Sequence, residues 1–305
     1  MTPDTNEAIA EIWQTETTET IRSSIFDYPI EHGRQYHAYK AGSYHRPNDE
    51  EELTRIDLVT VIFNLVNKGK MHHVPLNPSS NLRILDIGTG TGSWCIEMGD
   101  AYPAADITGI DLSASMPELV PPNVQFEIDD AEDPWTYDQP FDFIHSRYML
   151  GAIRNWPGMV RQCFDNLTPG GYIELQDFDL DYYSVDGSLT PDHALKRWLT
   201  ASYAAEEITG RTLRPGRQLE GWLKAAGFVN VQVIRTPIPL GPWPKDERQK
   251  RIGLLNWTQL WEGLPGLSLR LFIDVLGYTR EELEILLMEV RKDMQSPSIH
   301  PMFDL

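Results

Sequence analysis

The 305-residue chain has only two cysteines, Cys95 and Cys163, and no apolar run that approaches the ~18–20 residues needed to cross a bilayer. Its opening, MTPDTNEAIAEIW, lacks the basic start and apolar stretch of a secretion signal. Both cysteines fall in segments that predict helices, so we interpret them as buried free thiols in a reducing compartment. These absences predict a soluble protein without a membrane segment, located in the cytoplasm or the nucleus.

Basic residues are also scarce, since 26 Lys and Arg stand against 45 Asp and Glu and give a formal net charge of −19. Such a surface repels phosphate backbones, which are recognised through basic side chains. No nucleic-acid partner is therefore expected. Neither His72 and His73 nor the set His32, His37 and His45 has the spacing of a metal frame, so no metal is predicted.

Short apolar runs alternate with helical patterns from residue 82 onward. The runs predict strands at residues 82–87, 106–112, 124–128, 141–146 and 172–178. Helices are expected at residues 93–101, 161–167, 194–208 and 218–226, followed by a β-rich run at 229–238. This alternation, with near-continuous apolar strands, predicts an α/β fold with a mostly parallel sheet and helices on both faces.

The flanking segments predict additions to this fold. Residues 1–30 are expected to form a mobile arm or a loosely docked helix. Asn48 is a candidate N-cap, with Glu51 as its reciprocal partner, for a helix closed by Gly69. Residues 246–290 are predicted helical, with a break at GLPGLS. We divide the chain into an N-terminal arm and helical lid (1–75), a Rossmann-like cofactor-binding domain (76–245), and a C-terminal helical segment packed on that domain (246–305).

The run LDIGTGTG at residues 85–92 follows the first predicted strand and precedes a helix, where nucleotide-type ligands meet an open α/β sheet. Its glycines let the chain turn sharply and approach a ligand closely. A dinucleotide fingerprint requires a third glycine at position 93, which is Ser93, and the carboxylate of Asp86 is unfavourable beside a pyrophosphate. An NAD-dependent oxidoreductase is therefore the weaker hypothesis.

S-adenosylmethionine suits the same loop, because it carries an ammonium and a sulfonium and no phosphate. Asp111 ends the second predicted strand, where an acid accepts ribose hydroxyls. Asp129, Asp130 and Ala131 follow the third, where a carboxylate and backbone can read the adenine amino group. Acids at three successive strand ends predict a cradle for a cationic adenosyl ligand.

Further segments carry a resemblance to a known family: GIDLSASMP, NVQFEIDDAEDPW, FDFIHSRYMLGAIRNWP, LTPGGYIELQDFD, LGPWPKD and EHGRQYHAYKAGSY. With LDIGTGTG they resemble the fungal LaeA-like methyltransferases, class I S-adenosylmethionine-dependent enzymes associated with secondary metabolism. The resemblance runs from about Glu31 to His300. The relatives usually continue beyond HPMFDL into a closing strand, so the strand order 3-2-1-4-5-7-6 expected for the family stays open at its last member.

The resemblance also implies roles for individual residues. Asp86, Gly88, Thr89 and Gly90 are expected to contact the methionine part of the cofactor, and Asp111 its ribose. Around the adenine it implies Leu112, Met116, Asp130 and Ala131. His145 is expected beside the methyl group and is the first candidate for a general base, with His37 second; a strand-end residue that merely holds the cofactor is the alternative.

The Tyr-rich segment before residue 47 is expected to fold over the cofactor as a lid, because aromatic faces attract a sulfonium cation. Tyr44 is a candidate cofactor contact, and Tyr36, His37 and Arg147 are candidate substrate contacts. Packing of these aromatic residues on the domain edge is the competing interpretation.

Two functions follow. The first is methyl transfer to a small-molecule acceptor of secondary metabolism, on oxygen. The second is a regulatory methyltransferase that acts through protein partners, for which Leu269, Phe272, Ile273 and the helix at 281–290 offer an apolar face, although a core role explains the same residues.

Overall fold

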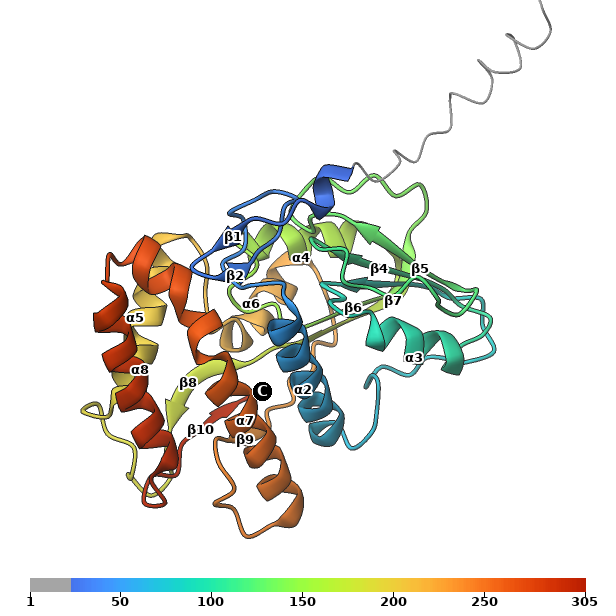
Figure 1. Ribbon diagram of the computed structural model, residues 1–305. Coiled ribbons are helices and arrows are strands. Elements are labelled where there is room, and N and C mark those ends of the chain that lie inside the picture. Colours follow the sequence, from blue (N-terminus) through green and yellow to red (C-terminus); the bar gives the residue numbers. More distant parts are fainter. Residues whose placement is uncertain (1–22) are drawn as a thin grey trace, which may run out of the picture.

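A parallel sheet of five strands organises the computed structural model, which describes residues 23–305 (Figure 1). The strands are β3 (Arg83–Ile87), β4 (Asp106–Asp111), β5 (Val124–Ile128), β6 (Phe141–Arg147) and β7 (Leu167–Gln176). They lie in the order β5-β4-β3-β6-β7, and each pair is parallel. The order reverses at β3, so a crevice forms beyond the carboxyl end of this strand. The predicted Rossmann-like α/β class is confirmed.

Helices cover both faces of this sheet, because alternate strand residues point in opposite directions. Ile84, Ile107 and Phe143 face α3 (Ser93–Ala101), whereas Leu85 and Ile144 face the opposite side. That side is covered by α4 (Trp156–Asp165) and α6 (Gly216–Ala226). As expected, Cys95 and Cys163 are buried free thiols, the first in α3 and the second in α4.

A small antiparallel sheet continues the larger one. Its strands are β8 (Asp179–Tyr183), β9 (Pro237–Pro239) and β10 (Met302–Asp304), in the order β8-β10-β9. If β3 is numbered as strand 1, the larger sheet has the order 3-2-1-4-5, in which β7 is strand 5. Strand β8 follows β7 after two residues and extends strand 5, and β9 and β10 are strands 6 and 7. The two sheets together therefore give the order 3-2-1-4-5-7-6. The segment HPMFDL therefore supplies the closing strand that the sequence left open.

The remaining helices form a second layer of structure beside the sheets (Figure 1). They are α2 (Glu50–Val66), α5 (Ala194–Ile208), α7 (Glu247–Leu269), the π-helix η2 (Arg270–Val275) and α8 (Arg280–Gln295). Leu269 and Phe272 are 3% and 0% exposed in the core of this layer, and Ile273 packs against it. All three are core residues. The hypothesis that Leu269, Phe272 and Ile273 form an apolar face for a protein partner is therefore wrong.

Short elements precede α2. They are η1 (Ser23–Phe26), β1 (Ile30–Glu31) and β2 (Arg34–Gln35), which pairs with β1. Of the arm predicted for residues 1–30, the first 22 residues lie outside the described part. Within residues 23–305, no helix has both the length and the apolarity needed to span a membrane.

Several predicted boundaries are wrong. The N-cap of α2 is Asp49 and not Asn48, since the Asp49 carboxylate accepts from the backbone N–H of Glu52 (3.1 Å) and also pairs with Arg34. The β-rich run at 229–238 yields only β9, and Val229 and Ile234 are exposed. Helix α4 begins five residues earlier than predicted, at Trp156, and β7 also begins five residues earlier than the predicted strand at 172–178, at Leu167.

The predicted break at GLPGLS is also absent, because α7 continues through Pro265 to Leu269. Proline cannot donate to the carbonyl four residues earlier, which belongs to Trp261. Arg291 of α8 places its Nη2 3.4 Å from that carbonyl oxygen. A side chain from a neighbouring helix thus replaces the missing backbone bond. The irregularity comes one turn later, in the π-helix.

Candidate active site

A cleft that is open to solvent lies at the carboxyl ends of β3, β4 and β5. The loops after these strands supply its floor, and the segment around His37 and Tyr44 together with α2 supplies its cover. Of the residues expected to hold the cofactor or substrate, the cleft brings together Gly88, Thr89, Gly90, Asp111, Leu112, Asp130, Ala131, His37, Tyr44 and Arg147.

The glycine-rich loop is held by β4. The N–H groups of Gly88 and Thr89 both donate to the Ile110 carbonyl, at 2.9 and 3.0 Å. Gly88 has φ +70°, and a Cβ there would lie 2.2 Å from the Met149 sulfur, so this position requires glycine. A Cβ on Gly90 would meet only Ile56 at 3.8 Å. The space above Gly90 is therefore free for a ligand.

Asp111 joins this loop to the next one. Its Oδ2 accepts from the Gly90 N–H (2.9 Å), and its Oδ1 accepts from the Ser113 N–H (3.0 Å). A carboxylate offers about four acceptor positions, so Oδ2 still has capacity for a further donor from the cleft. These bonds fix the carboxylate with one edge toward the cleft, as the binding of a ribose hydroxyl requires.

The third strand end meets the cover of the cleft. Lys40 places its Nζ 2.9 Å from Asp130 Oδ2 and 2.5 Å from Asp133 Oδ1. Asp130 Oδ1 accepts from the Glu132 N–H (2.9 Å). Ala131 and Ile153 provide apolar walls nearby. Asp130 therefore tethers the N-terminal segment over the same end of the cleft that the sequence assigns to adenine.

The aromatic residues of that segment divide into two groups. His37 and Tyr44 line the cleft with their ring centroids 5.3 Å apart. Burial lowers the pKa of His37, so its imidazole is neutral at pH 7, and burial raises the pKa of Tyr44 to about 12. Tyr36 is fully buried, with the Arg270 guanidinium 3.5 Å from its ring centroid. Its expected substrate contact is wrong, because it is a packing residue.

His145 and Asp86 do not reach the cleft. They form a buried pair in which His145 Nδ1 lies 2.7 Å from Asp86 Oδ1, and the imidazole stacks on Trp94 at 3.9 Å. His145 is 0% exposed and Asp86 is 3% exposed, and neither lines the cleft. The expectations that His145 acts beside the methyl group and that the Asp86 side chain contacts the cofactor are therefore wrong.

Two further expectations have different outcomes. Met116 is half-buried one residue after Ser115, which lines the cleft, and its place beside the adenine stays a prediction. Arg147 does line it and donates to Thr60 Oγ1 of α2 (3.2 Å). Burial lowers the pKa of Arg147. Its guanidinium connects the end of β6 to the cover of the cleft.

Tyr148 is the main residue that the sequence did not reveal. It has φ +61°, an unfavourable conformation for an aromatic residue. Its hydroxyl accepts from Arg55 Nη1 (2.8 Å), and the backbone N–H of Met149 donates to Asp177 (2.8 Å). The ring lines both the cleft and a second cavity. No sequence pattern predicts a tyrosine at positive φ, because only tertiary contacts hold Tyr148 in this conformation.

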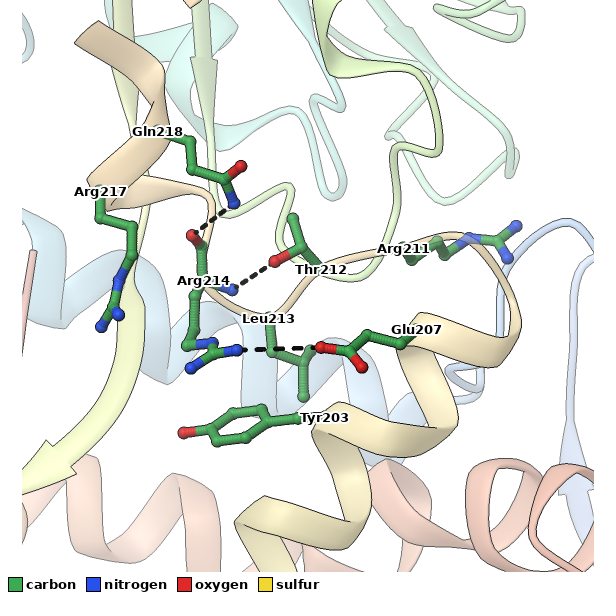
Figure 2. A pocket seen from close by; sticks show the side chains of 8 residues that line it. All are labelled: Tyr203, Glu207, Arg211, Thr212, Leu213, Arg214, Arg217 and Gln218. Atoms are coloured by element: carbon green, nitrogen blue, oxygen red, sulfur yellow. Dashed lines mark hydrogen bonds and ion pairs between the residues drawn. The ribbon is translucent and has the colours of Figure 1, made fainter. Parts of the chain in front are cut away.

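A separate depression lies between α5 and α6 (Figure 2). Arg214 lies above the Tyr203 ring at 4.4 Å and 4.0 Å from Glu207, and Arg217 pairs with Asp179 and Asp181. The Arg211 side chain extends away from the other labelled side chains (Figure 2) and donates to the Ala152 carbonyl. The arginines of this depression are thus already bonded to other groups of the protein. We therefore place the candidate active site in the cleft.

Comparisons with known proteins agree with this geometry. The sequence model of a family described as "Methyltransferase domain" matches residues 63–233. "Methyltransferase pytC" of Aspergillus terreus is 43% identical over 286 residues, 93% of this chain and 88% of that protein. "Secondary metabolism regulator LAE1" of Cochliobolus heterostrophus is 36% identical over 78% of this chain and 80% of its own length. "Protein-methionine methyltransferase laeA" of Emericella nidulans is 31% identical over 88% of this chain and 72% of its own length.

Proposed function

Because this chain belongs to the fungal LaeA-like class I methyltransferases and uses S-adenosylmethionine, we propose that it methylates a small-molecule acceptor of secondary metabolism, on oxygen. The observation that carries this proposal is the apolar lining that α2 gives the cleft, with Leu53, Ile56 and Phe63 beside the position assigned to the cofactor. A cavity lined mainly by aromatic and aliphatic side chains suits a small apolar molecule.

The cleft suits the cofactor in three places. The open space above Gly90 accommodates the methionine part, and the available acceptor edge of Asp111 suits the ribose. The apolar walls at Leu112, Ala131 and Ile153 suit the flat adenine. The cofactor supplies an electrophilic methyl group on a sulfonium.

The residues of the chain act mainly by positioning. Displacement at a methyl carbon requires alignment of the acceptor with the carbon–sulfur bond, and orientation alone lowers such barriers substantially. The Lys40 tether and α2 cover part of the cleft and hold the segment around His37 and Tyr44 over it. Of the two proposed bases, only His37 lies in the cleft, and its lowered pKa leaves it able to accept a proton at neutral pH.

Regulation through protein partners is the second candidate, favoured by the relatives named "Secondary metabolism regulator LAE1" and "Protein-methionine methyltransferase laeA". Methyl-labelled S-adenosylmethionine separates the two. Purified protein is incubated with an extract of a producing culture, and the labelled products are fractionated by size. A labelled small molecule supports the proposal, whereas label confined to protein assigns the second function. An Asp111→Ala variant should lower labelling in either case when S-adenosylmethionine is held near the wild-type Kd.

A further inference from the structure

The lining of the cleft is acidic except at one place. Among the described residues that line it, Arg147 is the only arginine or lysine, whereas three aspartates, Asp111, Asp129 and Asp130, line it at the ends of β4 and β5. Lys40, which tethers the cover, is already paired with Asp130. Arg147 is therefore the side chain that can attract an anion into this cleft.

The Arg147 guanidinium is incompletely bonded. Within residues 23–305, its one side-chain hydrogen bond goes from Nη2 to Thr60 Oγ1 (3.2 Å), and no carboxylate lies within 4.0 Å of it. Asp86 attracts it through space but is bonded to His145 (2.7 Å). A guanidinium presents five N–H donors in a fixed fork. Most donors of Arg147 are thus available to a ligand.

Strand register places Arg147 at the end of the cleft that we assign to the methionine part of the cofactor. Ser146 pairs with Ile87 across β6 and β3, so Arg147 comes level with Gly88, the first residue of the glycine loop. A Cβ on Gly88 would lie 2.2 Å from the Met149 sulfur, which shows that the segment after β6 touches this loop. Arg147 therefore lies near the reacting end of the cofactor and away from the adenine.

The apolar side of the cleft leads to the same arginine. The guanidinium carbon of Arg147 lies 5.8 Å from the Phe63 ring centroid. Its partner Thr60 is one helical turn from both Ile56 and Phe63, so the three side chains share one face of α2. Ile56 is also the residue nearest to a Cβ built on Gly90, at 3.8 Å. An apolar molecule that lies along α2 would thus present its polar end to Arg147.

The methionine part of the cofactor also carries a carboxylate, but the glycine loop offers that group other donors. Helix α3 begins at Ser93, two residues after Thr91 of the cleft lining, and its N-cap Gly92 has no side chain to cap the first N–H groups. Such N–H groups attract anions. The bond to Thr60 and the contact with Phe63 instead hold Arg147 against α2. This orientation favours the acceptor as the ligand of Arg147.

We infer that the acceptor is an apolar carboxylic acid, that Arg147 binds its carboxylate, and that the product is a methyl ester. This inference rests on the proposed function and gives its acceptor a chemical class. One carboxylate oxygen stays on Arg147 while the other forms a bond to the methyl carbon. The carbon–sulfur bond breaks and its electron pair stays on sulfur, which gives neutral S-adenosylhomocysteine. A carboxylate is ionised at pH 7, so no proton moves and no base is needed.

Alkali treatment of the labelled product tests this with wild-type protein. The full chain is incubated with methyl-labelled S-adenosylmethionine and with the acidic or the neutral fraction of an organic extract of a producing culture. The acidic fraction should yield the labelled small molecule, and mild alkali should release its label as volatile methanol, since esters hydrolyse and ethers do not. Label that resists alkali would overturn the inference and not the proposed function, because an acceptor hydroxyl would then react. Absence of any labelled small molecule would overturn the proposed function itself.

Variants of Arg147 test its role. Arg147→Met should lower the initial rate of ester labelling at limiting acceptor by at least about tenfold, while the Kd for S-adenosylhomocysteine stays within about twofold. Arg147→Lys keeps the charge and should recover part of the rate. Arg214→Met, outside the cleft, is the matched control and should label at the wild-type rate. The inference is overturned if Arg147→Met labels as fast as wild type. It is also overturned if this variant binds S-adenosylhomocysteine more weakly but binds methylthioadenosine, which lacks the amino-acid part, as wild type does; Arg147 would then hold the cofactor carboxylate.

Discussion

Asp111 offers the sharpest test of the cofactor cleft. Replacement by alanine removes the acceptor of two backbone N–H groups, those of Gly90 and Ser113, and the edge that we assign to the ribose. A hydrogen bond to a charged group contributes about 1.5–3 kcal/mol. Loss of one such bond to the ribose, with partial loosening of the glycine loop, predicts a loss in binding free energy of about 2–3 kcal/mol.

This loss corresponds to a rise in the S-adenosylmethionine Kd of about 30–150-fold, at 1.4 kcal/mol for each tenfold. Calorimetric titration of folded protein measures it directly. Asp111→Asn keeps one acceptor oxygen and should lie between wild type and alanine. The matched control is Asp106→Ala, because this exposed aspartate begins the same strand at the end far from the cleft.

The control should leave the Kd within about twofold of the wild-type value. If Asp111→Ala also stays within twofold while its thermal unfolding remains cooperative, Asp111 does not hold the ribose, and the assignment of the cleft would be refuted.

Three more predictions follow from the geometry. His145→Phe keeps the stacking on Trp94 but leaves the Asp86 carboxylate buried and unpaired. Unfolding titrations should show that the free energy of unfolding falls by about 3 kcal/mol or more, while the Kd of the folded protein for S-adenosylmethionine is unchanged. A variant that loses methyl transfer but keeps normal stability would instead show that His145 takes part in the chemistry. Burial raises the pKa of Asp177 from 3.8 to about 7, so between these pH values the folded state keeps a proton that the unfolded chain releases. The stability that the protonated Asp177 carboxyl contributes is therefore lost as the pH rises from 4 to 7. The unfolding free energy of Asp177→Asn relative to wild type should therefore rise by up to about 4 kcal/mol between pH 4 and 8, and a pH-independent difference would contradict the raised pKa. Lys40→Met should change the unfolding free energy by less than about 1 kcal/mol, as for other partly exposed ion pairs, yet accelerate cofactor release in stopped-flow measurements; an unchanged rate would mean that the tether does not hold the cover.

The errors at Asp86 and His145 have a common cause in strand register. Asp86 and His145 end neighbouring strands, which is why the sequence suggests a shared place beside the cofactor. The register pairs Asp86 directly with His145, and both side chains turn toward α3 and Trp94. Since side chains alternate between faces with a period of two, a strand-end position alone does not decide whether a residue faces the cleft.

The sequence by itself determined the parallel sheet, the glycine loop and the acids at the ends of β4 and β5. These features depend on local periodicity and on the rule that the carboxyl ends of parallel strands share one edge. It also identified His37 and Tyr44 of the cover, because aromatic residues concentrated before α2 have no helical or strand period of their own.

Only the tertiary structure decided which side chains meet across the chain. The Asp86–His145 pair joins residues 59 positions apart, and the positive φ of Tyr148 depends on contacts such as the one with Arg55, 93 positions away. Local propensity contains no information about these distances. Packing of α2, α5, α7 and β10 into one core brings distant side chains together.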